Sequence, residues 1–228
     1  MRMLAVFEKS ERIRHIGHLD IQRSVQRGLR RSGLPVAYSQ GFNPHILITF
    51  ASALSTGACG KREIMDVTLA AETDPELFVR KMNQAMPPEM QLSEARTLDD
   101  RHPSLMSLTA AAEYRLVIRD PECAGKLAEA VPGLLAEDKI TAIRKTKTKL
   151  TECDIKPLIL SLTAEKKEGI TSLHCMLVLN EQESCKPQML LEALKREAGV
   201  TDEVRMLVIR ESLLGEDENG HLTPLEKL

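Results

Sequence analysis

The alternation of apolar and polar residues over the first hundred positions predicts a mixed unit of helices and strands. Over residues 18–32, Ile21, Val25 and Leu29 recur at helical spacing and share one face. Short apolar or alternating runs predict strands over residues 3–7, 45–50, 63–69 and 90–95. A second helix is expected to start at Asp74-Pro75, which supplies a capping side chain and a proline in the first turn. The predicted order is β-α-β-β-α-β.

The second half of the chain repeats this pattern. Strands are predicted over residues 114–118, 140–145, 155–162, 170–179 and 204–209, and helices are expected from Pro121 and from Pro187. We therefore predict an α+β fold of two tandem ferredoxin-like (βαββαβ) units with antiparallel sheets, over residues 1–100 and 110–210. Residues 211–228 are rich in Glu, Asp and Gly and are expected to form an acidic, loosely held C-terminal tail.

Composition narrows the classes of function. The 228 residues carry a net charge of −2, which excludes a globally basic nucleic-acid binder, and the 3% of aromatic residues argues against a base-stacking platform. No apolar run is long enough to span a membrane, and the N-terminal residues lack the apolar core of a signal peptide. The five cysteines are scattered and form no CxxxCxxC motif. They are expected to be reduced thiols in a cytoplasmic protein that carries no iron–sulfur cluster or other cofactor of its own.

The charge is unevenly distributed, and the helix over residues 18–32 holds the first basic cluster. Its arginines lie almost opposite the apolar face, and a further arginine precedes the helix: Arg23, Arg27, Arg30, Arg31 and Arg14. Guanidinium groups form forked hydrogen bonds with phosphates, so this face is a candidate binding site for RNA or for a nucleotide. The alternative is a solvated face that pairs with the chain's own acids, such as Asp20.

A second basic segment covers residues 139–151, which contain no acidic residue. On one extended strand Lys145, Lys147 and Lys149 would point the same way and form a cationic ladder for RNA phosphates. The alternative is an edge strand whose lysines prevent aggregation.

Three of the six histidines, His15, His18 and His45, lie near the arginines in the sequence. Imidazoles suit acid–base chemistry at neutral pH, whereas metal binding is not expected, because no clear set of carboxylates or thiols surrounds them. The alternative is structural, with His18 at the start of the helix and His45 at the start of a strand. The turn over residues 41–44 offers backbone amides and the side chain of Asn43 to a phosphate or a base edge, or only connects the helix to that strand.

Long motifs in the first half resemble a known family. These are HIGHLDxxRxxxRxLRRSGLPVAYSQGFNPH over residues 15–45, FASALSTG over residues 50–57, and Glu63-x-x-Asp66-Val67. They resemble the radical-SAM-linked protein family, whose members are found beside, or fused to the C-terminus of, a cobalamin-binding-type radical SAM protein. Here Ile46 follows the motif where a second proline is frequent in the family, and Gly60 stands where a serine is usual.

The resemblance implies a cytoplasmic bacterial partner of a radical SAM enzyme, encoded near genes for an RNase and for ribosomal proteins. It also implies which positions matter beyond the arginines, histidines and Asn43 named above: Asp20, Tyr38, Gly41, Phe42, Pro44 and Glu63.

Three hypotheses follow. The first is a non-catalytic accessory subunit of a radical SAM enzyme, which binds or presents an RNA substrate through the arginine-rich helix. The second is a metal-independent RNA-processing enzyme that uses one of the three histidines as a base. The third is a protein-interaction module whose arginines dock on an acidic surface of the radical SAM partner.

Overall fold

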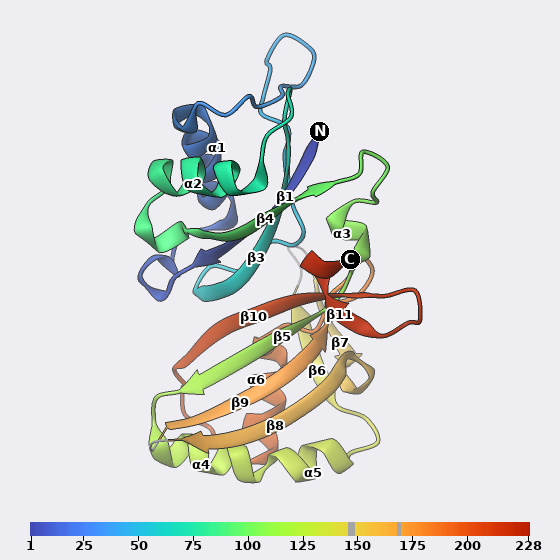
Figure 1. Cartoon of the computed structure of the whole chain (residues 1–228). Coiled ribbons are helices and arrows are strands. Elements are labelled where there is room, and N and C mark those ends of the chain that lie inside the picture. The colour runs from blue at the N-terminus through green and yellow to red at the C-terminus, as the bar shows by residue number, and fades with distance from the viewer. Residues whose placement is uncertain (146–148, 168–169) are drawn as a thin grey trace. The chain divides into compact units, whose positions relative to one another are not determined.

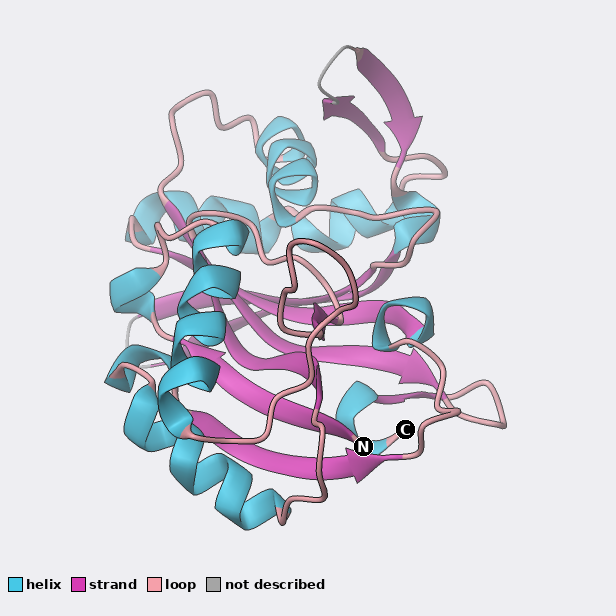
Figure 2. Cartoon of the chain, turned by 90° about the horizontal axis from the view of Figure 1, so that it is seen from above, coloured by secondary structure: helices cyan, strands magenta, loops and turns pink. Residues whose placement is uncertain are grey.

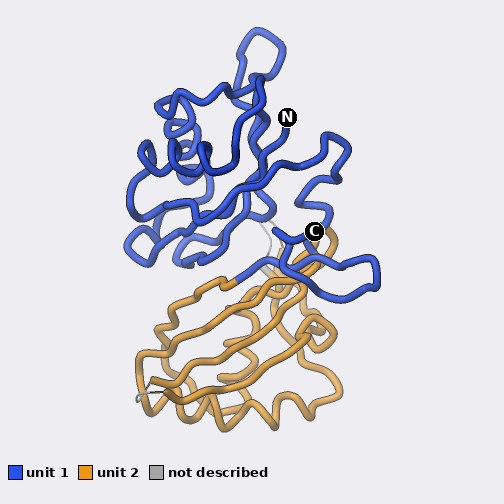
Figure 3. Tube along the Cα trace, viewed as in Figure 1, with its two compact units in different colours: residues 1–109, 212–228 blue, residues 110–211 orange. Residues whose placement is uncertain are grey.

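The structure is a computed structural model that describes residues 1–145, 149–167 and 170–228, and it divides the chain into two compact units (Figure 3). Unit 1 comprises Met1–Thr109 and Ser212–Leu228, and unit 2 comprises Ala110–Glu211. The chain contains both helices and strands (Figure 2) and is a mixed α+β protein with mostly antiparallel sheet, as predicted. No helix within the described residues is long and apolar enough to cross a membrane.

Unit 1 contains the following elements: β1 (Arg2–Lys9), α1 (His18–Ser32), β2 (Ile48–Phe50), β3 (Ala58–Thr68), α2 (Pro75–Ala85), β4 (Leu92–Leu98), α3 (Leu105–Leu108) and β11 (Leu222–Pro224). Short 3-10 helices cover Glu11–Ile13, Pro88–Met90 and Leu225–Lys227. The strand order is β4-β1-β3, and β2 also pairs with β3; all three pairs are antiparallel. Strand β10 (Met206–Glu216) starts in unit 2 and ends in unit 1, where it pairs with β11.

The core of unit 1 lies between its sheet and the helices α1 and α2, which run beside each other (Figure 1). Alternate residues of β1 and β3 face these helices, because side chains of a strand point to opposite faces in turn: Met3, Ala5, Phe7, Met65 and Val67. From α1, the residues Ile21, Val25 and Leu29 complete this core, so the predicted apolar face is confirmed.

The predicted bounds of α1 are confirmed at both ends. The helix runs from His18 to Ser32 and ends at Gly33, whose φ of 66° is the left-handed conformation that glycine adopts without strain. The start of α2 at Pro75 is also confirmed, because the carboxylate of Asp74 accepts a hydrogen bond of 2.9 Å from the amide of Leu77.

Unit 2 contains the following elements: β5 (Thr109–Ile118), α4 (Pro121–Glu129), α5 (Val131–Ala136), β6 (Thr141–Lys145), β7 (Leu150–Asp154), a 3-10 helix (Lys156–Leu158), β8 (Ile159–Lys167), β9 (Ile170–Val178), α6 (Pro187–Glu197) and the first half of β10. The strand order is β10-β5-β9-β8, with β9 antiparallel to both β5 and β8. Both α4 and α6 begin at the expected prolines.

Three predicted strands differ most from the structure. The strand expected over residues 155–162 begins only at Ile159 as β8, because Lys156–Leu158 form a 3-10 helix. The strand expected over residues 45–50 is reduced to β2, because His45 is hydrogen-bonded to Ser39 across a loop instead of to a neighbouring strand. The strand expected over residues 140–145 is β6, but it pairs with β7 in a separate two-stranded sheet and not with the main strands of unit 2.

The C-terminal residues are not a loosely held tail, and that prediction is wrong. Leu213 and Leu225 are fully buried in unit 1. Nε of Arg62 donates to the carboxylate of Glu226 at 2.8 Å, and Nε of Arg96 donates to the backbone carbonyl of the same residue, also at 2.8 Å. The acidic composition of the segment obscured its buried leucines, which anchor it by removing apolar surface from water.

Candidate functional site

The arginine face of α1, defined as Arg23, Arg27, Arg30 and Arg31, is exposed as predicted. Arg23 forms an ion pair of 2.9 Å with Asp20, and Nη2 of Arg31 donates to the carbonyl of Ala85 at 2.5 Å. Within the described part of the chain, Arg27 and Arg30 have no hydrogen-bond or ion-pair partner. Pairing with the chain's own acids therefore accounts for one of the four arginines.

The surroundings of the arginine face are also basic. The neighbouring helix α2 adds an exposed Arg80 and a half-buried Lys81, whose Nζ lies 3.5 Å from the carbonyl of Gly33. The two helices together carry six basic residues against Asp20 and Glu76. In the sequence, residues 21–62 contain no acidic residue at all. Such a surface attracts polyanions more strongly than the net charge of the chain suggests.

The turn over residues 41–44 forms the tip of a braced loop. Below the tip, the hydroxyl of Ser39 accepts from the amide of His45 at 3.1 Å and bonds Nδ1 of its ring at 2.8 Å, and the amide of Ser39 donates to the carbonyl of His45 at 2.9 Å. These bonds hold His45 within the loop, ahead of β2, and not at the start of a strand as the structural alternative expected. The tip residues Gly41, Asn43 and Pro44 are all exposed, and Phe42 is completely exposed.

The remaining predicted site residues with cationic or imidazole side chains in unit 1 differ in their exposure and in their partners. Arg14 is half-buried, and its guanidinium lies on Glu11, 3.2 Å from the carbonyl and 3.6 Å from the carboxylate. His15 is exposed and has no partner among the residues that the structure describes. His18 starts α1, and its ring packs edge-on against Phe50 with centroids 5.2 Å apart. Of these three side chains, His15 alone is exposed and without a partner among the described residues.

A polar cluster lies where α1 begins and consists of two buried residues, Lys9 and Glu63, and two half-buried ones, His18 and Ser52. These four residues line a cavity of about 10 Å³, together with apolar neighbours that include Phe50. Lys9 and Glu63 are only 2% and 4% exposed, which is unusual for charged side chains, because burial of an unpaired charge is costly. Nζ of Lys9 donates to the carbonyl of Arg14 at 2.9 Å and so ties β1 to the segment before α1.

Sequence reasoning found half of this cluster. His18 and Glu63 were singled out, whereas Lys9 and Ser52 were not. In β1, Lys9 follows the inward-facing residues 3, 5 and 7 at the same spacing. A charged residue at an inward-facing position was therefore the feature of the sequence that could have revealed it. No group of three or more metal-binding side chains occurs in the described ranges.

The lysine-rich segment of unit 2 does not form one strand. Lys145 ends β6 and pairs with Leu150 of the antiparallel strand β7, so the chain has reversed direction before Lys149, which is exposed. Lys147 lies outside the described residues, and the structure describes only the backbone of Lys145. The prediction of a single extended ladder is therefore wrong for Lys145 and Lys149.

The cysteines provide no activated nucleophile. All five are free thiols, and Cys59, Cys175 and Cys185 are buried. Burial raises the pKa of Cys175 and that of Cys185 to about 12, so neither is a thiolate near neutral pH.

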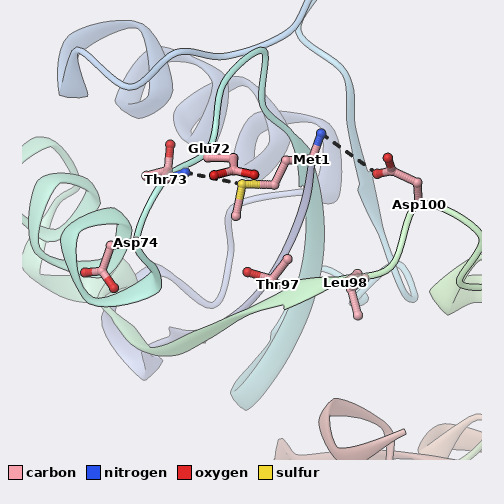
Figure 4. A pocket seen from close by; sticks show the side chains of 7 residues that line it. All are labelled: Met1, Glu72, Thr73, Asp74, Thr97, Leu98 and Asp100. Atoms are coloured by element: carbon pink, nitrogen blue, oxygen red, sulfur yellow. Dashed lines mark hydrogen bonds and ion pairs between the residues drawn. The ribbon is translucent and has the colours of Figure 1, made fainter.

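A larger hollow in unit 1 has the opposite charge to the arginine face (Figure 4). Its volume is about 550 Å³, and it is lined by Met1, Glu72, Thr73, Asp74, Thr97, Leu98 and Asp100. None of the binding or catalytic residues predicted from the sequence lines it. Three carboxylates make it unsuited to a phosphate ligand, and Asp74 already caps α2.

Comparisons with known proteins assign the chain to one family. No curated protein matches the chain. Among solved structures, an unknown protein from Galdieria sulphuraria is similar at 16% identity and a TM-score of 0.27, over 92% of this chain and 97% of that one. A candidate transcriptional repressor of the glycine cleavage system is similar at 11% identity and a TM-score of 0.22, over 92% and 98%. Such low TM-scores support no conclusion about fold or function. Residues 2–187 match a family model, and the chain therefore belongs to the family described as "Uncharacterized protein conserved in bacteria (DUF2344)".

Proposed function

We propose that the chain is a cytoplasmic, non-catalytic accessory subunit of a radical SAM enzyme, and that it binds or presents an RNA substrate through the arginine face of α1. The observation that carries this proposal is the state of Arg27 and Arg30, which are exposed and have no partner within the described residues. Two guanidinium groups without a partner, on a helix that packs against α2 with its Arg80 and Lys81, suit a ligand with several phosphates. The radical SAM partner rests on the family resemblance of the sequence motifs.

We also propose that both units are ferredoxin-like. In unit 1 the order β1-α1-β2-β3-α2-β4 is a βαββαβ series, with β1 and β3 side by side at the centre of the sheet. In unit 2 the same series is formed by β5, α4 with α5, β8, β9, α6 and β10, in which β5 and β9 are the central pair. The β6–β7 hairpin is then an insertion between the first helix and the second strand.

The test is a salt series of binding to total bacterial RNA. We expect binding at low salt that weakens steeply towards physiological salt, and its loss in the double variant Arg27→Glu/Arg30→Glu. Neither side chain holds a structural contact within the described residues, whereas Arg31 bonds α2, so this pair changes charge without loosening the fold. The matched control is Lys166→Glu/Lys167→Glu, which reverses two exposed charges of β8 in unit 2.

Two results would contradict the proposal: no binding at low salt, or equal binding by the α1 variant and its control. Co-purification with the radical SAM protein after nuclease treatment, lost in the same α1 variant, would favour a protein-interaction module instead.

The polar cluster favours a second candidate function, a metal-independent RNA-processing enzyme. His18 lies beside a buried lysine, a carboxylate and a hydroxyl, and such neighbours can tune an imidazole for proton transfer. RNA cleavage that is abolished by His18→Ala and unaffected by His15→Ala, which lies outside the cluster, would support this candidate. Absence of cleavage by the wild-type chain would reject it.

A further inference from the structure

The exposed aromatic side chains of this protein gather in one loop. The chain has only four Phe and two Tyr residues. Four of the six are buried: Phe7, Phe50, Phe78 and Tyr114. The other two are Tyr38 and Phe42, which are 43% and 105% exposed. The low aromatic content argues against a base-stacking surface, but the two exposed aromatic side chains lie in the same loop.

The loop that carries Phe42 is held firmly at its base. Besides the bonds between Ser39 and His45, the amide of Ala37 donates to the carbonyl of Thr68 at 2.9 Å, and the amide of Leu47 donates to the carbonyl of Ala37 at 3.0 Å. Thr68 is the last residue of β3, so the loop is anchored to the sheet. Because the base of the loop is already ordered, binding a ligand at its tip costs less backbone entropy than ordering a free loop would.

The loop and the arginine face belong to the same unit and are close along the chain. Phe42 is eleven positions after Arg31, and eleven extended residues span at most about 39 Å. A nucleic acid strand carries one phosphate per 3.4 Å, so roughly eleven stacked nucleotides cover that distance. A short oligonucleotide is therefore long enough to contact both places.

We infer that Phe42 is a base-stacking residue, which takes an unpaired base of a single-stranded RNA whose phosphates lie on the arginine face of α1. This inference rests on the proposed function and specifies its substrate class. An aromatic ring stacks on any base, because every base has a π-face.

Two observations favour a base over a protein surface as the occupant. The residues that flank Phe42 at the loop tip, Gln40, Gly41, Asn43 and Pro44, provide no contiguous apolar patch, which the core of a protein interface requires. The absence of acidic residues from residues 21–62 also suits an anionic ligand.

The experiment compares two probes of the same charge, a single-stranded uridine 12-mer and inorganic polyphosphate. We expect Phe42→Ala to weaken binding of the 12-mer by roughly 5- to 150-fold, which is the range for removing one stacked base. Binding of polyphosphate, which has no base to stack, stays unchanged. The control Met106→Ala removes another exposed apolar side chain of unit 1 and leaves both affinities unchanged. Because Phe42 is completely exposed, its replacement does not disturb the fold.

A second variant reports on the contact directly. The chain contains no tryptophan, so Phe42→Trp introduces a single indole at the loop tip. We expect this variant to keep its affinity for the 12-mer and to show quenching of its fluorescence by the 12-mer but not by polyphosphate. A 12-base-pair RNA duplex, whose bases are already stacked, should bind wild type and Phe42→Ala equally.

The outcomes separate this inference from the proposed function. If Arg27→Gln/Arg30→Gln weakens binding of the 12-mer but Phe42→Ala does not, the inference is wrong and the proposed function stands. Equal losses of 12-mer and polyphosphate in Phe42→Ala also overturn the inference, because the loop then acts without stacking. If Phe42→Ala loses only a protein partner, Phe42 is a protein-docking residue. If the wild type binds neither probe, both proposals fail.

Discussion

Neutralising two arginines of α1 should change the salt dependence of RNA binding by an amount that the structure allows to be calculated. The double variant Arg27→Gln/Arg30→Gln removes two charges and no hydrogen bond within the described residues. Arg23 and Arg31 remain, one on Asp20 and one on the carbonyl of Ala85. The variant is therefore a test of charge and not of folding.

The magnitude follows from counterion release. For single strands the logarithm of the binding constant falls with the logarithm of salt concentration, with a slope of about −0.7 for each phosphate that the protein neutralises. Arg23 is already paired with Asp20, so three arginines of the face are left to neutralise phosphates. They give a slope of about −2.1, so affinity falls by about 18-fold between 50 and 200 mM salt. The one that remains in the variant gives a slope of about −0.7 and a fall of about 3-fold over the same range.

The assay is fluorescence anisotropy of a labelled uridine 12-mer at five or more salt concentrations. The control Lys166→Gln/Lys167→Gln removes two exposed charges from β8 and should keep the wild-type slope. A slope near zero for the wild type would refute the reasoning. So would a slope that changes as much in the control as in the α1 variant, because the arginines of α1 would then have no special role.

Three further predictions concern the rest of the structure. Leu225→Ala should destabilise unit 1 by about 3–5 kcal/mol in urea unfolding, because it empties a fully buried site; a loss below about 0.5 kcal/mol would show a loose C-terminus. Lys9→Met should increase amide hydrogen exchange around Arg14, because it removes one of the two donors to that carbonyl and leaves only the amide of Gly57; unchanged exchange would show that the lysine does not hold this segment. With their pKa raised to about 12, Cys175 and Cys185 should resist alkylation at pH 8 until urea unfolds the chain, since roughly one such thiol in ten thousand is ionised; mass spectrometry after iodoacetamide treatment measures this.

The sequence allowed the elements with strong local signals to be predicted accurately. The bounds of α1 were correct because an apolar stripe and Gly33 agree on where the helix ends. The expected strand over residues 45–50 was too long because its apolar residues also suit a chain that only bridges Tyr38 to Ile46. The buried position of Leu225 depends on contacts with distant parts of unit 1, which a local pattern does not contain.

The candidate site was predictable to a different extent. Helical periodicity identified the exposed arginines, since their exposure follows from the burial of the opposite face. Periodicity could not show which arginines have partners, because that depends on side-chain conformation and on residues distant in the sequence. In the structure Arg23 and Arg31 have partners, and Arg27 and Arg30 have none within the described residues. The complete exposure of Phe42 was equally out of reach, as composition counts rings without locating them.

The motif over residues 15–63 therefore contains two kinds of residue that act in different ways. An inner set, His18 and Glu63, lies with Lys9 in the polar cluster at the start of α1. An outer set, Arg27 and Phe42, contacts no core and faces solvent. Substitutions of the inner set should first lower stability, because they disturb buried polar groups, and alter ligand binding only through the position of α1. Those of the outer set should alter binding in a chain that remains folded, and this separation distinguishes a binding surface from residues that only stabilise it.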